Sequence, residues 1–217
     1  PYDLIETENF EEAYERFLRD YDGINVTAPF KELAVRKADI LSEECRQIGA
    51  ANILLKTPEG IKAYNSDYLG VRQWLSEVAE SLDIRPTILI VGLGGAGKAA
   101  AQAARSLGYE VTLMNRTQYT DDIRPLSEFR EAFKAADIII YNIPSAIPAL
   151  SGLAPEDFGA GKPKFIMEAN YKDPSFDNEL IMKMKQANPL ASYTSGKVWL
   201  LYQALTGYEI FTGERPD

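Results

Sequence analysis

Short apolar runs alternate along this chain with longer amphipathic stretches. Residues 87–91 (TILIV) form one such run, and its length and β-branched side chains are typical of a buried strand. Residues 8–20 instead place apolar side chains at helical spacing, as at Phe10, Tyr14 and Phe17. Strands that alternate with helices in this way predict an α/β fold, in which crossover helices connect parallel strands.

The expected elements fall into two groups that meet near residues 83–86. In the first group we expect strands at 2–7, 23–27, 50–56 and 61–67, and helices at 8–20, 42–49 and 67–82. In the second group we expect strands at 87–91, 110–114, 137–142 and 162–171, an alanine-rich helix after the first of these strands, and an apolar helix at 195–211. The second group therefore begins with one complete βαβ unit, at residues 86–117.

Composition excludes several classes of function. The chain has 217 residues and a net charge of −9, and no block of Lys and Arg interleaves with aromatic residues. Nucleic acid and anionic membranes are therefore not expected partners. The single cysteine, Cys45, cannot form an internal disulfide, and no apolar run approaches the length of a membrane span, so we expect a cytoplasmic protein. Because the chain contains no histidine, acid–base chemistry must use Lys, Asp, Glu or Tyr. We expect no metal site.

A glycine-rich turn carries the clearest chemical signal. Gly92, Gly94 and Gly97 match G-x-G-x-x-G directly after the strand at 87–91 and directly before a helix. In such a turn, the first glycine permits the tight bend, the second lets a pyrophosphate approach the backbone, and the third allows the helix to pack on the strand. The turn residues expected to bind a dinucleotide are Gly92, Gly94, Gly95, Ala96 and Gly97.

A second phosphate-binding motif overlaps this turn. Gly92 to Lys98 also satisfy G-x-x-x-x-G-K, the phosphate loop of nucleotide triphosphatases. The next residue, however, is Ala99, where a hydroxyl should bind magnesium, and the strand at 137–142 does not end in an aspartate. The motif therefore indicates a dinucleotide rather than a triphosphate.

The end of the second strand of the βαβ unit indicates which dinucleotide binds. An acidic side chain there would bind the ribose hydroxyls of NAD, but this strand runs into Asn115, Arg116 and Thr117. The planar guanidinium of Arg116 suits the 2′-phosphate of NADP. NADP is therefore the expected cofactor; the alternative is that Arg116 is a surface residue near Asp121 and Asp122.

Six short motifs together resemble those of the shikimate dehydrogenase family in order and spacing. They are NVTAPFK, GAANIL, YNSD, VGLGGAGKAA, NRT and LLYQA, and the resemblance runs from Tyr2 to Thr212. It implies an NADP-dependent oxidoreductase of aromatic biosynthesis that interconverts 3-dehydroshikimate and shikimate. It also implies two α/β domains: residues 1–84, completed by a C-terminal helix within 189–217, bind the substrate, and residues 85–188 form a doubly wound Rossmann-type domain.

The resemblance also implies roles for individual residues. It places a catalytic pair at Lys31 and Asp67, substrate-binding side chains at Thr27, Asn52, Tyr171 and Gln203, and a backbone approach to the nicotinamide at Gly196. A proton donor of the Lys31 type suits this chemistry, because a ketone that accepts a hydride becomes an alkoxide and must be protonated. Five of these side chains also have a simpler explanation: Lys31 as a solvated lysine in a turn, Asp67 as a helix cap, Asn52 and Gln203 as ordinary polar groups, and Tyr171 as a packed aromatic.

Three departures from the family pattern stand out. The family begins with a strand and a serine-containing loop that binds the substrate carboxylate, and nothing in this chain matches them. The chain starts at what resembles the second strand, so about 30 residues, one strand–helix unit, are expected to be missing. The segment YNIPSAIPAL differs from the usual loop beside the nicotinamide ribose, and one extra residue separates Tyr171 from Pro174.

Two alternative functions stay open from the sequence. Quinate could replace shikimate, with NAD in place of NADP, or the chain could be a non-catalytic NADP-binding module. The sequence does not distinguish a monomer from a homodimer, because nothing in it identifies a self-complementary surface.

Overall fold

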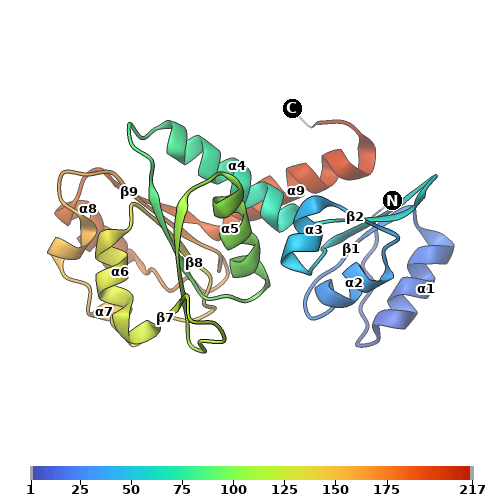
Figure 1. Ribbon diagram of the computed structural model, residues 1–217, viewed down its shortest axis with the longest axis horizontal. Helices are drawn as coiled ribbons and strands as arrows, with labels where there is room; N and C mark the ends of the chain where they lie inside the picture. Colours follow the sequence, from blue (N-terminus) through green and yellow to red (C-terminus); the bar gives the residue numbers. More distant parts are fainter. Residues whose placement is uncertain (1, 216–217) are drawn as a thin grey trace. The chain divides into compact units, whose positions relative to one another are not determined.

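The computed structural model describes residues 2–215 and contains two compact units (Figure 1). The first unit extends to Ser66 and resumes at Leu205, and the second comprises Asp67–Ala204. These limits differ from the expected domain boundaries at 84/85 and 188/189, which stay a prediction.

The first unit is built on a four-stranded sheet with strand order β1-β3-β4-β2. The strands are β1 (Gly23–Asn25), β2 (Ile40–Leu41), β3 (Ile53–Thr57) and β4 (Gly60–Tyr64). β3 pairs antiparallel with β1 and β4, and β2 pairs parallel with β4, so the sheet is mixed. The expected strand pair around Pro58–Gly60 is confirmed as the hairpin of β3 and β4.

Three helices cover one face of this sheet. They are α1 (Phe10–Asp20), α2 (Lys31–Lys37) and α3 (Glu43–Ile48). Buried side chains of the helices, Phe17, Ala34 and Cys45, form one apolar core with Leu54 and Ala63 of the strands. The end of α9 (Gly196–Thr212) also belongs to this unit, and a Cβ added at Gly207 would lie 3.4 Å from the Cδ1 atom of Ile53.

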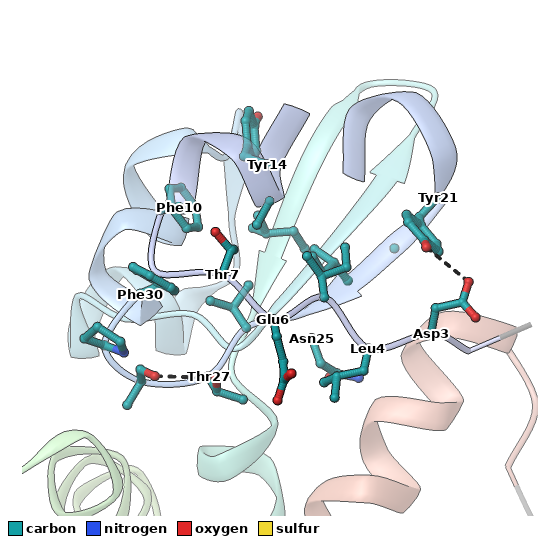
Figure 2. A pocket seen from close by; sticks show the side chains of 18 of the residues that line it. Asp3, Leu4, Glu6, Thr7, Phe10, Tyr14, Tyr21, Asn25, Thr27 and Phe30 are labelled. Atoms are coloured by element: carbon teal, nitrogen blue, oxygen red, sulfur yellow. Dashed lines mark hydrogen bonds between the residues drawn. The ribbon is translucent and has the colours of Figure 1, made fainter. Parts of the chain in front are cut away.

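The prediction of a strand at residues 2–7 is wrong, because no strand forms there. β1 is the edge strand, and Val26 N donates to Asn52 O at 2.8 Å on its β3 side. By the alternation of an antiparallel ladder, the backbone groups of Gly23 and Asn25 therefore point away from β3. A cavity of about 810 Å³ separates this edge from the segment 2–8 (Figure 2). The segment therefore lies too far from β1 to complete a ladder with it.

The second unit contains a six-stranded parallel sheet with strand order β10-β9-β8-β5-β6-β7. The strands are β5 (Thr87–Val91), β6 (Glu110–Asn115), β7 (Ile123–Pro125), β8 (Ile138–Tyr141), β9 (Lys164–Glu168) and β10 (Ala191–Ser195). The chain proceeds from β5 to one edge and then returns to build the other half from β8. This order confirms the doubly wound Rossmann-type sheet, whose topological switch point lies between β5 and β8.

Helices cover both faces of the parallel sheet (Figure 1). α4 (Ser66–Glu80), α5 (Gly95–Ser106) and the start of α9 contribute to a core with Ile88 and Ile90, whereas α6 (Phe129–Ala135), α7 (Pro148–Ser151) and α8 (Asn178–Ala187) contribute to a core with Leu89 and Val91. Successive side chains of β5 thus enter opposite cores, as expected for a strand that is buried on both faces. Within residues 2–215, no helix has the length and apolar composition needed to cross a membrane.

Candidate active site

The glycine turn lies at the carboxyl end of the central strand β5. Gly92 has a φ of 86°, in the region that favours glycine, and its N–H donates to Met114 O at 2.8 Å. A Cβ at Gly97 would lie 1.9 Å from Gly92 O, so the start of α5 packs directly on the turn. The first and third glycines of the motif therefore have the geometric roles that the sequence predicts.

The exposed part of the same turn has room for a ligand. A Cβ added at Gly94 or Gly95 would meet nothing within 4 Å, and both residues are exposed. α5 begins at Gly95, so its unpaired amide groups face this open space. In the adjoining wall, Asn142 Oδ1 is buried and has no hydrogen-bond partner among the described residues. An open glycine turn at a helix start fits the pyrophosphate of a dinucleotide.

The loop after β6 borders the turn. Leu93 N donates to Asn115 Oδ1 at 3.3 Å, and Asn115 Nδ2 donates to Thr117 O at 3.1 Å, so Asn115 ties the loop to the glycine turn. Arg116 follows and is exposed. No ion pair between Arg116 and a carboxylate is found in residues 2–215, which leaves its guanidinium available for a phosphate.

The nearby acidic residue Asp122 is already occupied. Its carboxylate accepts hydrogen bonds from Thr120 Oγ1 at 2.6 Å and from Arg105 at 3.4 Å. The hydrogen bond from Thr120 is the main reason why the pKa of Asp122 lies below its usual value. Asp122 is therefore held by partners other than Arg116.

Loops at the carboxyl ends of β8 and β9 lie on the same edge of the sheet. Tyr171 lies in the loop after β9, and its side chain is 37% exposed. Gly196 begins α9 directly after β10, and a Cβ there would lie 2.3 Å from Ala169 O. Gly196 and the loop that carries Tyr171 are therefore in contact. Any side chain at position 196 would displace that loop.

Asp67 and Gln203 belong to two helices of the second unit that touch each other. Asp67 is in the first turn of α4, where a carboxylate is favoured by the helix dipole, and its carbonyl accepts a hydrogen bond from Trp199 Nε1 at 2.9 Å. One turn further along each helix, a Cβ at Gly70 would lie 2.8 Å from Gln203 N. The structure therefore brings Asp67 and Gln203 into one neighbourhood.

Lys31, Thr27 and Asn52 lie close together in the first unit. Thr27 O accepts a hydrogen bond from Phe30 N at 3.0 Å, and this turn leads directly into α2, which begins at Lys31. Ala51 N donates to Lys31 O at 2.9 Å, which holds Lys31 next to Asn52. The pairing of Lys31 with Asp67, which belong to different units, stays a prediction.

Asn52 is buried, with 5% of its surface exposed, and it binds the start of α4. Its Oδ1 atom accepts from Ser66 N at 2.7 Å, and its Nδ2 atom donates to Ser66 Oγ at 3.0 Å. Asn52 therefore fixes the residue that directly precedes Asp67 in the chain. A role in substrate binding would come in addition to this structural one.

The cavity beside β1 shares Thr27 with these residues (Figure 2). Asp3, Glu6 and Glu8 line it, and no lysine or arginine is among the described residues that line it. A cavity with acidic side chains and no cation is poorly suited to an anionic substrate. The carboxylate of such a substrate would need donors from elsewhere.

Cys45 takes no part in the site. It is fully buried in the core of the first unit, and burial raises the pKa of its thiol to about 12. A thiol that stays protonated is a poor nucleophile.

Comparisons with known proteins identify the family. The model of the shikimate dehydrogenase substrate binding domain matches residues 1–54, and the model of the NAD binding domain of D-isomer specific 2-hydroxyacid dehydrogenases matches residues 54–162. The shikimate dehydrogenase (NADP(+)) of Caldicellulosiruptor saccharolyticus is 32% identical over 227 residues, which cover 96% of this chain and 79% of the relative. This chain belongs to the shikimate dehydrogenase family.

Solved structures agree with this assignment. Shikimate 5-dehydrogenase from Thermus thermophilus, in complex with NADP(H) and shikimate, matches with a TM-score of 0.76 and 26% identity, over 98% of this chain and 81% of that one. Quinate dehydrogenase from Corynebacterium glutamicum, in complex with NAD, matches with a TM-score of 0.77 over 96% of this chain and 79% of that one. At 19% identity, the second likeness supports the fold alone.

Sequence reasoning missed several residues that shape the site. Gly70 lies inside a helical pattern, where an isolated glycine indicates a close packing contact, and this signal was available. No local sequence pattern marks Trp199 or Glu168. Trp199 donates to the carbonyl of Asp67, which is distant in sequence, and Glu168 accepts from a backbone N–H group.

Proposed function

We propose that this protein catalyses the reversible, NADP-dependent oxidation of shikimate to 3-dehydroshikimate. The observation that supports this function best is the open glycine turn at the start of α5, bordered by Arg116, in a member of the shikimate dehydrogenase family. The amide groups at Gly94 and Gly95 would bind the pyrophosphate, and Arg116 would bind the 2′-phosphate. When bound, NADPH supplies the reducing equivalent for the ketone.

The residues of the chain supply the proton and the orientation. In the direction of reduction, Lys31 Nζ donates a proton to the ketone oxygen as that oxygen becomes an alcohol. The carboxylate of Asp67 keeps the ammonium group in place. Asn52 and Gln203 bind ring hydroxyls, and Tyr171 binds the substrate carboxylate. With no histidine in the chain, Lys31 is the preferred proton donor.

Initial rates with four substrate pairs test this function. Shikimate or quinate is supplied with NADP or NAD, and the absorbance of the reduced nicotinamide is followed. We expect the highest kcat/KM with shikimate and NADP. A preference for quinate with NAD would replace the proposed substrate and cofactor. Tight NADPH binding without turnover of either acid would indicate a binding module.

A further inference from the structure

A buried carboxylate lies at the carboxyl end of β9, next to the predicted site. Glu168 is the last residue of this strand, is fully buried, and is in register with Tyr141 of β8 and Ser195 of β10. It therefore lies at the edge of the parallel sheet where ligands of doubly wound folds bind. No lysine or arginine pairs with it among residues 2–215. A buried, unpaired charge is costly unless several hydrogen bonds satisfy it.

Three donors satisfy this carboxylate. Oε1 accepts a hydrogen bond from Ser175 N at 2.5 Å, and Oε2 accepts from Phe176 N at 3.1 Å and from Tyr193 Oη at 2.9 Å. Two of the three donors are backbone groups at the far end of the loop that follows β9. Glu168 therefore holds both ends of this loop, since it is itself the residue at which the loop begins.

The loop between these ends has its own internal support. Asn170 Oδ1 accepts from the backbone N–H groups of Lys172 and Asp173, at 3.2 and 3.3 Å, and Asn170 Nδ2 donates to Pro144 O at 3.0 Å. Tyr171 therefore lies between a turn that Asn170 organises and an end that Glu168 anchors. The contacts of Asn170 leave the return of the loop to the sheet undefined. Glu168 defines that return through the backbone of Ser175 and Phe176.

The third donor links the loop to β10. Burial and the neighbouring Glu168 raise the pKa of Tyr193, so its hydroxyl stays protonated and can donate. The ring of Phe176 packs between Tyr141 and Tyr193, with ring centroids 5.6 and 5.7 Å away. β10 then leads directly to Gly196, which contacts Ala169 at the start of the loop. One carboxylate thus connects the segments that carry Tyr171 and Gly196.

We propose that Glu168 is a positioning residue that fixes the Tyr171 loop for binding of the substrate carboxylate. This inference rests on the proposed function, in which Tyr171 contacts that carboxylate. Glu168 does not touch the reacting atoms. It acts through the backbone of Ser175 and Phe176.

The Glu168→Gln variant tests the inference. Glutamine has nearly the same shape, but its amide group places a donor opposite one of the donors that now face the carboxylate. We expect the KM for shikimate to rise at least 10-fold, whereas kcat stays within 3-fold and the dissociation constant of NADPH within 2-fold. In a Tyr171→Phe background, the same substitution should raise KM less than 3-fold, because the side chain that the loop positions no longer binds.

Two controls separate positioning from general destabilisation. Ile166→Val removes a buried methyl group from the same strand and should lower stability while leaving KM unchanged. Tyr193→Phe removes one donor but keeps both backbone hydrogen bonds, so KM should change less than 3-fold. Equal KM increases for Glu168→Gln with and without the tyrosine at position 171 would overturn the proposal, as would no increase at all.

A second measurement is independent of activity. Amide hydrogen exchange at Ser175 and Phe176 should be at least 10-fold faster in Glu168→Gln than in the unaltered protein, and unchanged in Ile166→Val. If the unaltered protein does not oxidise shikimate, the proposed function fails, and the exchange rates still decide whether Glu168 anchors the loop. Equal exchange rates in both proteins would overturn the anchoring role.

Discussion

Arg116 is the residue on which the choice between NADP and NAD is expected to depend. It follows β6 beside the glycine turn, is exposed, and has no carboxylate partner within residues 2–215. A hydrogen bond between charged groups contributes about 1.5–3 kcal/mol, which corresponds to roughly 10- to 100-fold in affinity. Arg116→Ala should therefore raise the KM for NADP by this factor and leave the KM for NAD nearly unchanged.

Initial rates with both cofactors check this prediction. Arg124→Ala is a suitable control, because Arg124 lies on the surface and pairs with Glu128 at 2.7 Å. An equal change in the KM of both cofactors would contradict the assignment of Arg116 to the 2′-phosphate.

Gly70 shows how one small residue allows two helices to approach. Glycine in a helix interior costs about 1 kcal/mol relative to alanine, so its presence in α4 needs a compensating contact. A Cβ there would lie 2.8 Å from Gln203 N, which requires α4 and α9 to separate. Gly70→Ala should lower the free energy of unfolding by about 1–3 kcal/mol and raise the KM for shikimate.

Urea unfolding measures the first effect, and initial rates measure the second. Gly152→Ala is the matched control, since a Cβ there would lie 3.5 Å from Ala149 O, an ordinary contact distance. If Gly70→Ala were as stable as the unaltered protein, the close contact between the helices would not constrain the fold.

The sequence predicted the helices and strands whose pattern of apolar and polar residues is complete within a short stretch of the chain. β5 and α5 were predicted because an apolar run, a glycine turn and an alanine-rich stretch follow one another. The strand expected at 2–7 was wrong, because a suitable pattern forms a strand only if a neighbour completes the ladder. β7 and β10 were not predicted, because β7 depends on pairing with β6 and β10 on pairing with β9.

Lys164 stabilises the end of α6 in a way that the sequence did not indicate. It begins β9, is 3% exposed, and donates to Phe133 O at 2.8 Å and also to Ala136 O. These carbonyls at the end of the helix have no partner within the helix itself. Burial lowers the pKa of Lys164 to about 8, and Asp137 and Asp157 oppose that shift.

This depressed pKa predicts a pH dependence of stability. Between pH 8 and about 10, the unfolded chain keeps the Lys164 proton that the folded protein loses, so the free energy of unfolding rises with pH. The slope contributed by Lys164 should not exceed about 1.4 kcal/mol per pH unit, because a single group releases at most one proton. Unfolding experiments from pH 7.5 to 9.5 should show this rise in the difference between the unaltered protein and Lys164→Met, because the buried Cys45 thiol, whose pKa is raised to about 12, lowers stability with rising pH equally in both proteins. A difference that does not change with pH would contradict this role of Lys164.

For the two units together, the sequence predicted α/β folds and the geometry of the glycine turn, whereas the binding of the cofactor by these residues stays a prediction. The glycine turn was predictable because its function and its geometry use the same residues, Gly92 and Gly97. The neighbourhood of Asp67 and Gln203 was not predictable by pattern, because it depends on where α4 and α9 cross. The resemblance to the shikimate dehydrogenase family implies roles for both residues, but only the structure shows why they lie close together.

In the proposed reaction, Lys31 provides the proton for the NADP-dependent reduction that yields shikimate. The most direct test is the kcat of Lys31→Met, measured together with the dissociation constant of NADPH. Lys37→Met is the control, because Lys37 lies at the other end of the same helix and pairs with Glu11 at 2.7 Å. We expect kcat to fall about 10²- to 10⁴-fold in Lys31→Met, with NADPH binding within 2-fold and the control fully active. A Lys31→Met enzyme that turned over shikimate at the unaltered rate would contradict the role of Lys31 as the proton donor.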